Sequence, residues 1–177
     1  MDREAFWKII ESSREQSEGD VEDQIDALRA LLMELTAEEV VAFDHEYDVL
    51  LQAAYRRDIW TAALLAGGGC SDDGFIFFRY WLVAQGREVY ESVLKDPEYL
   101  AEILDEDGDE GQVEGFESLA TEIWGEKTGR DPISDFPDPQ PGPSAVSRSE
   151  PAGERISQED WPSRFPRLWA RFGAKHW

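Results

Sequence analysis

The chain is poor in the residues that most often build cross-links and reactive centres. Its 177 residues include one cysteine and two histidines. A single cysteine cannot form a disulfide within the chain, which fits a reducing compartment. His45 is the only histidine before the C-terminal segment, so a metal centre or a nucleophilic Cys70 would have one imidazole to use.

Basic residues are scarce as well. The 17 Lys and Arg face 39 Asp and Glu, which gives a net charge of −22. Such a chain repels nucleic acids and anionic membranes, because binding phosphates requires clustered Lys and Arg. No apolar run approaches the roughly 20 residues that span a bilayer, and residues 1–4 lack the pattern of a signal peptide. We therefore expect a cytoplasmic protein with no nucleic-acid partner and no membrane partner.

What the sequence does contain is helical periodicity. Apolar residues in 21–35 recur at steps of three and four, as on one face of a helix. Thr36 followed by Glu39 matches a capping box, and Asp96 before Pro97 matches a cap followed by proline at the first helical position. No segment shows the alternation of a strand. The pattern predicts an all-α fold, with a bundle-like domain of about six to seven helices at residues 1–129.

The composition changes after this domain. Residues 130–155 are rich in Pro, Gly and Ser, which predicts an extended linker. In the tail, residues 156–177, aromatic and basic side chains are interleaved. Residues 161–177 have four basic and no acidic side chains, whereas residues 1–130 have 11 basic and 32 acidic ones. The tail should therefore be attracted to an acidic surface, either on its own domain or on a neighbouring chain or partner. We expect the tail to interact through Trp161, Arg164, Trp169, Arg171 and Trp177.

The most unusual stretch joins three glycines, residues 67–69, to the single cysteine and an acidic helix start. Ser71 is suited to cap a helix whose first turn holds two aspartates. Backbone amides of the glycines, the helix start and Arg79 could bind a phosphate or carboxylate. The aspartates would repel such an anion, so the alternative is a well-capped connection in which Arg79 pairs with an acid. The candidate binding residues are Cys70, Ser71, Asp72, Asp73, Arg79, Trp81, Arg87 and His45.

Other chemistries find weaker support. A helix start would lower the pKa of the Cys70 thiol but neighbouring aspartates would raise it, which favours a structural cysteine. His45 and Asp48 share a helix face and could bind a divalent metal together with Asp72 or Asp73. An acidic loop matches the first three ligands of a calcium loop but has Glu110 at the glycine position and Phe116 in place of the last acid. These three matching ligands are Asp105, Asp107 and Asp109. We expect no metal and no cofactor, and we assign no catalytic residue.

Several short motifs make the chain similar to a known family. They are the run at residues 68–75, Phe78-Arg79-x-Trp81-Leu82, Gly86-Arg87-x-x-Tyr90 and the early Phe6-Trp7. Together they resemble the bacterial family of domains of unknown function numbered 4240, over about residues 1–128. The resemblance implies a bacterial, mostly helical domain. It draws attention to several of the candidate residues without assigning a role to any.

Three functions are compatible with these features. We favour a non-catalytic protein-interaction or regulatory module, with a protein partner or self-association through the tail. The alternative is an enzyme or a small-molecule or anion-binding protein that uses residues 70–73 with Arg79. This alternative predicts a concave pocket where Asp72 or Asp73, Arg79 and a further polar side chain converge. A third possibility is an acidic mimic of DNA.

Overall fold

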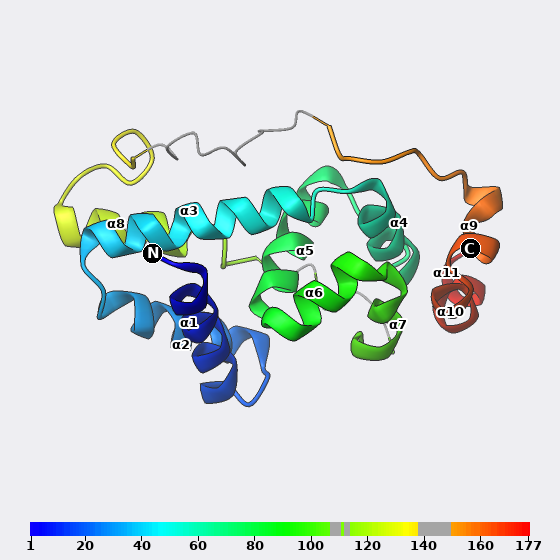
Figure 1. The fold of residues 1–177 in the computed structure, drawn as a ribbon, viewed down its shortest axis with the longest axis horizontal. Helices are drawn as coiled ribbons and strands as arrows, with labels where there is room; N and C mark the ends of the chain where they lie inside the picture. Colours follow the sequence, from blue (N-terminus) through cyan, green and yellow to red (C-terminus); the bar gives the residue numbers. More distant parts are fainter. Residues whose placement is uncertain (107–110, 112–113, 138–149) are drawn as a thin grey trace.

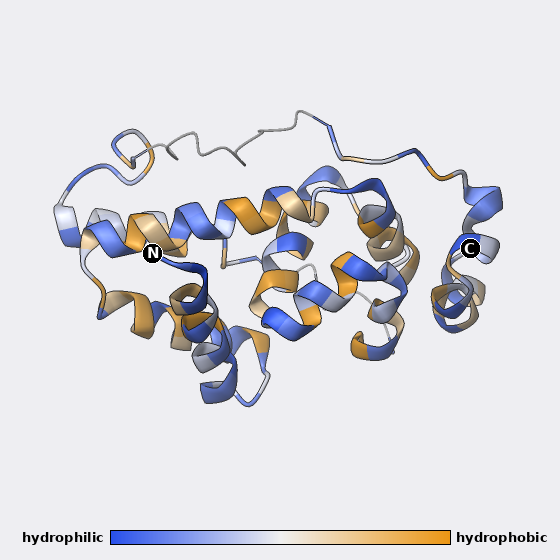
Figure 2. Ribbon diagram, in the orientation of Figure 1, coloured by the Kyte–Doolittle hydropathy of each residue, from blue (hydrophilic) through white to orange (hydrophobic). Residues whose placement is uncertain are grey.

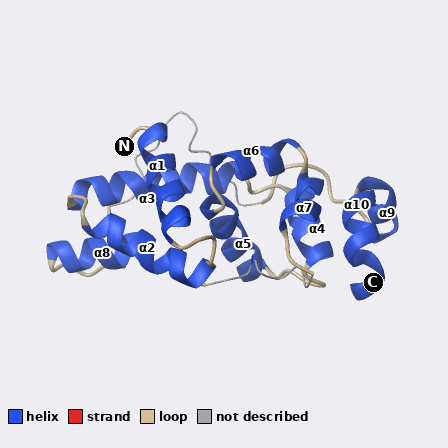
Figure 3. Ribbon diagram, turned by 90° about the horizontal axis from the view of Figure 1, so that it is seen from below, coloured by secondary structure: helices blue, strands red, loops and turns tan. Residues whose placement is uncertain are grey.

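The computed structural model describes residues 1–106, 111, 114–137 and 150–177 (Figure 1). These residues form helices joined by loops and contain no strand, so the predicted all-α class is confirmed (Figure 3). The described part of the body already has more helical segments than the six or seven expected for residues 1–129, and the tail adds further helical turns. The body contains α1 (Arg3–Gln16), α2 (Val21–Met33), α3 (Ala37–Ala53), α4 (Arg57–Ala66), α5 (Asp72–Ala84), α6 (Arg87–Lys95), the 3-10 turn η1 (Pro97–Tyr99), α7 (Leu100–Ile103) and α8 (Leu119–Thr128).

Residues 158–176 form a chain of short helical turns. They are η3 (Gln158–Asp160), α9 (Trp161–Arg164), α10 (Pro166–Leu168), the π-helical η4 (Trp169–Gly173) and α11 (Ala174–His176).

Local capping signals act as the sequence predicts. The Glu39 N–H donates to Thr36 Oγ1 at 3.2 Å, and the Thr36 N–H donates to Glu39 Oε2 at 2.8 Å, which completes the capping box of α3. The Asp96 side chain accepts from the Glu98 N–H at 3.1 Å, with proline in between. Gly86 has φ +91°, a conformation that glycine adopts without steric cost, and it separates α5 from α6.

Two helix ends follow from local contacts and burial. α1 continues through polar residues to Gln16, and its Ser13 is buried and donates to the Ile10 carbonyl at 2.7 Å. The last helix of the body, α8, begins at Leu119, which is buried.

The helices are arranged along one long axis (Figure 1). α3 runs along this axis, with α8 beside it at one end and α1 and α2 packed nearby. α5 contacts α1, α3, α4 and α6, while the tail lies against α4 and α7 at the opposite end. The helices carry both hydrophilic and hydrophobic residues along their length (Figure 2). A single cluster of buried apolar side chains includes both Phe6 in α1 and Phe172 in η4, so the tail contributes to the same core as the body.

Candidate functional site

The Ser-Asp-Asp corner lies on the surface as a helix cap. The Gly74 N–H donates to Ser71 Oγ at 3.0 Å, which confirms the predicted N-cap of α5. Ser71, Asp72 and Asp73 are all exposed. The negative charges of Asp72 and Asp73 are at the positive end of the helix dipole, where they stabilise α5. The corner therefore has a clear structural role.

Arg79 is separated from this corner and is almost fully buried, with 9% of its surface exposed. Its Nη1 donates to the Leu51 carbonyl at 3.1 Å and its Nε to the Phe75 carbonyl at 3.3 Å. The guanidinium carbon is 4.6 Å from the centre of the Tyr55 ring. Burial lowers the pKa of Arg79. The expectation that Arg79 pairs with an acid is wrong for the described residues, because its hydrogen bonds satisfy a carbonyl near the end of α3 instead.

The other candidate residues occupy separate places. Trp81 is buried in the core. Arg87 donates to Glu4 at 2.6 Å and to Glu91 at 2.8 Å near the surface. His45 Nε2 is 3.2 Å from the Pro137 carbonyl oxygen. Residues 70–73 are neighbours only because they follow one another in the chain. The remaining candidates, Arg79, Trp81, Arg87 and His45, lie at separate places in the structure.

Cys70 is half-buried beside α4. Its carbonyl accepts from Trp60 Nε1 at 3.0 Å. Burial raises the pKa of the Cys70 thiol to about 12, so the thiolate needed for nucleophilic attack is scarce at neutral pH.

No group of three or more His, Cys, Asp and Glu is placed to hold a metal ion in the part of the chain that the structure describes. Of the calcium-like motif, Asp105 is described, while Asp107, Asp109 and Glu110 lie outside the described residues.

Sequence reasoning considered Asp48 as a metal ligand but missed Asp44, which lies one turn before it on α3. Burial raises the pKa of Asp44 to about 7, and the neighbouring Asp48 carboxylate adds to this shift. Burial also raises the pKa of Asp48, while His45 and Arg79 oppose the rise. The only sequence signal was that Asp44 lies between Phe43 and Tyr47, both of which face the core.

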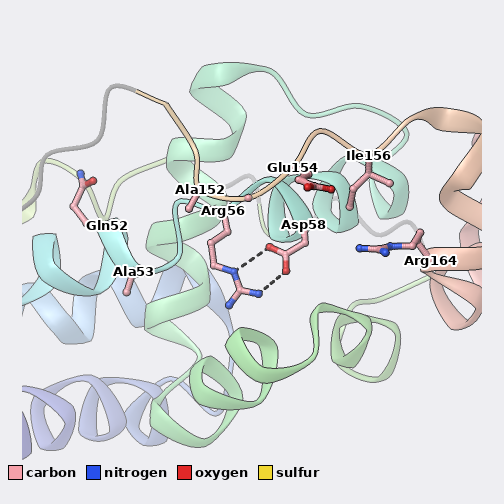
Figure 4. Close-up of a pocket in the computed structure, with 9 residues that line it drawn as sticks. Gln52, Ala53, Arg56, Asp58, Ala152, Glu154, Ile156 and Arg164 are labelled. Carbon is pink, nitrogen blue, oxygen red and sulfur yellow. Dashed lines mark hydrogen bonds and ion pairs between the residues drawn. The ribbon is translucent and has the colours of Figure 1, made fainter.

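Two hollows flank the segment that leads into the tail. The first, which we call the Arg56 hollow, has a volume of about 550 Å³. Arg56 Nε donates to Asp58 Oδ1 at 3.0 Å there, and the Arg164 side chain extends toward the same carboxylate (Figure 4). The residues lining it are Gln52, Ala53, Arg56, Asp58, Ala152, Gly153, Glu154, Ile156 and Arg164. Both signs of charge line this hollow.

The second hollow, the Trp60 pocket, has a volume of about 480 Å³. It lies between α4 and residues 155–161, and it shares Ile156 with the Arg56 hollow. The residues lining it are Arg57, Trp60, Thr61, Leu64, Cys70, Arg155, Ile156, Ser157, Gln158 and Trp161.

The tail is docked on the surface made by α4, η1 and α7, which we call the docking face. Arg167 pairs with Asp96 and, at 2.6 Å, with Glu102. Leu168 and Phe172 are fully buried, so they anchor the tail in the core. Sequence reasoning named Trp161 and Arg171, which do contact the body, but it did not name Leu168 or Phe172 among the contacts. The spacing of four, three and four residues along Trp161, Phe165, Leu168 and Phe172 would have identified the buried side of the tail.

Arg171 adds a second set of contacts from the tail. Its Nη2 donates to the carbonyl oxygens of Leu104 at 2.8 Å and Asp105 at 3.1 Å, and its Nη1 donates to the Ala101 carbonyl. These carbonyls lie at and beyond the C-terminal end of α7, where a cation is favoured by the helix dipole.

Comparison with known proteins adds a family. A search of curated proteins and a search of solved structures each found no match. No helix in the described ranges combines the length and the apolar character needed to cross a membrane. Residues 1–125 match the model of a family described as "Protein of unknown function (DUF4240)". The chain belongs to this family, as the motifs around residues 68–90 predict.

Proposed function

We propose that this protein is a non-catalytic protein-interaction module whose docking face binds a helical aromatic and basic segment. In the isolated chain, its own tail occupies that face. The observation that supports this most is the arrangement around Arg167, where three acids surround one guanidinium beside two fully buried apolar anchors. The acids are Asp96, Glu98 and Glu102.

The two kinds of contact have different roles in recognition. Burial of a side chain the size of Leu168 or Phe172 stabilises the docked state by about 1.5–3 kcal/mol. Exposed ion pairs such as those of Arg167 contribute about 0–1 kcal/mol each. The apolar anchors therefore supply most of the affinity. The acids select a basic partner and set its orientation.

The position of the family match supports this proposal. α4, η1 and α7 lie inside residues 1–125, which match the family model, whereas the tail lies outside them. An additional segment that covers a binding face can regulate access to it, because a partner must displace it before binding.

A competition experiment with the full chain tests this proposal. The double substitution Leu168→Ser and Phe172→Ser should release the tail without changing the docking face. A labelled peptide of residues 158–177 should then bind this variant at least tenfold more tightly than it binds the wild-type chain, as measured by fluorescence anisotropy. The same peptide with Arg167→Glu and Arg171→Glu is the matched control and should bind more weakly.

Failure of the peptide to bind a variant whose helix content by circular dichroism matches the wild type would reject the proposal. Dimers of the wild-type chain in size-exclusion chromatography that the double substitution abolishes would support binding between copies through the same face. The interpretation as an enzyme and the interpretation as a DNA mimic stay predictions.

A further inference from the structure

We propose that the Trp60 pocket binds a small organic anion that carries a flat apolar group. The pocket has a volume of about 480 Å³, within the range of sites that hold metabolites. Neither the family match nor the predicted binding residues assign this site, although Cys70 forms part of its wall.

The charge of the lining is the first argument. Arg57 and Arg155 both line the pocket, and none of the ten described lining residues is acidic. Arg57 is paired at 2.8 Å with Glu150, whose side chain is 77% exposed and therefore easily displaced. Arg155 makes no ion pair within the described residues. The chain as a whole has a net charge of −22, whereas this pocket is lined by two arginines and no acid. The lining therefore favours anions.

The aromatic walls are the second argument. The Trp60 ring is stacked on Phe75 at 4.8 Å with an interplanar angle of 10°, and its Nε1 is hydrogen-bonded to Cys70. The Trp161 ring packs edge-on against Trp177 at 5.0 Å. Neighbours thus hold both indoles in place. Such preorganised rings offer surfaces against which a planar group can pack at little entropic cost.

The polar groups of the lining complete the picture. The Gln158 amide, which can donate hydrogen bonds, lies in the same lining as Arg57 and Arg155. The pocket therefore offers two cationic groups, an amide donor and flat apolar walls.

The pocket is made from two parts of the chain. Arg57, Trp60 and Thr61 come from α4, whereas Arg155 and Trp161 come from the segment that leads into the tail. The pocket is complete only while the tail is docked, so an anion that binds there must also favour the docked state. This consequence rests on the proposed function, but the pocket itself does not.

The test uses the full chain and three probes that differ only in the group attached to a naphthalene ring. We expect 1-naphthyl phosphate and 1-naphthoate to bind in isothermal titration calorimetry, and uncharged naphthalen-1-ylmethanol to bind at least tenfold more weakly. Comparison of the two anions tells whether the site prefers phosphate or carboxylate. Arg155→Gln should weaken binding at least fivefold, whereas the exposed Arg130→Gln, which removes the same charge far from the pocket, should leave it unchanged.

Three outcomes would overturn the assignment: no binding of either anion at millimolar concentration, equal binding of the uncharged probe, or equal loss with both arginine substitutions. Inorganic phosphate that binds as tightly as 1-naphthyl phosphate would overturn the role of the indoles. Hydrogen exchange of residues 158–177 should slow when the anion is bound. If the anion binds but hydrogen exchange of residues 158–177 does not slow, the pocket is supported and its coupling to the tail is overturned. This result distinguishes failure of the coupling from failure of the pocket.

Discussion

Glu98 and Arg167 are joined by two kinds of contact across 69 residues of sequence. Glu98 Oε1 accepts a hydrogen bond from the Arg167 backbone N–H at 2.6 Å, and Glu98 Oε2 is 3.6 Å from Arg167 Nε. The same Oε1 accepts the Leu168 N–H at 3.2 Å. An acid of the body therefore caps a helical turn of the tail. This cap is an obvious point at which to loosen docking.

We predict that Glu98→Ala destabilises the docked tail by about 1–3 kcal/mol, because a partly buried carboxylate that accepts two backbone N–H groups is lost. Hydrogen exchange measured by mass spectrometry should increase in residues 161–177 and stay unchanged in α1 and α2. Exposed Glu88→Ala on α6 is the control and should leave the tail protected. Unchanged tail exchange in Glu98→Ala would show that the apolar anchors alone hold the tail.

A second prediction concerns Gly68, which has φ +68° and lies against the last residues of the chain. A Cβ added there would be 2.7 Å from His176 Nδ1. Gly68→Ala should cost about 1 kcal/mol in backbone strain and should displace His176. Fluorescence of the C-terminal Trp177 should change as a result. Gly69→Ala, whose Cβ would meet nothing within 4 Å, is the matched control. Equal spectra for the two variants would contradict the packing described.

A third prediction follows from the pKa of Asp44, which is raised to about 7 by burial. The folded state holds this proton more tightly than the unfolded state, so the stabilisation from the protonated carboxyl is complete at low pH and is lost as the pH rises toward 7. Asp44→Asn should therefore increase the free energy of unfolding at pH 8, by about 2–4 kcal/mol. The gain should shrink at pH 5.

Urea denaturation at both pH values measures this effect. Exposed Asp135→Asn serves as the control and should show no comparable gain. Destabilisation by Asp44→Asn at pH 8 would mean that the ionised carboxylate has a stabilising partner, and it would refute the prediction.

A fourth prediction separates structure from binding at Arg79. Arg79→Met keeps the apolar stem but removes the hydrogen bonds to the carbonyls of Leu51 and Phe75. We expect a loss of about 2–3 kcal/mol in unfolding free energy, because a buried carbonyl at the end of α3 loses its donor. Arg87→Met, which breaks only exposed ion pairs, should cost about 1 kcal/mol or less. Similar losses in the two variants would argue against the structural role of Arg79.

A fifth prediction tests the reactivity of Cys70. With its thiol pKa raised to about 12, Cys70 should react with iodoacetamide at pH 8 at least tenfold more slowly than free cysteine, followed by mass spectrometry. Denaturation in urea should restore the rate. Fast labelling of the folded chain would revive the case for a nucleophile.

Part of the candidate site was predictable because it depends on neighbours in the chain. Ser71 caps α5 through an N–H three residues away, and such contacts follow from residue type and spacing. The destination of Arg79 was not predictable. The Leu51 carbonyl is 28 residues away, and many acids offered a simpler partner in a chain of this charge. The Trp60 pocket could not be predicted either, because its walls come from segments about 95 residues apart in the chain.

The sequence by itself determined the helical class, the caps and the basic character of the tail, because these follow from periodicity, local hydrogen bonding and composition. Only the tertiary structure decided that the tail covers α4 and α7, and that Trp60 and Trp161 line one pocket. Charge attraction between an acidic body and a basic tail has no direction of its own. The fit of Leu168 and Phe172 into the core selects one face among many acidic ones.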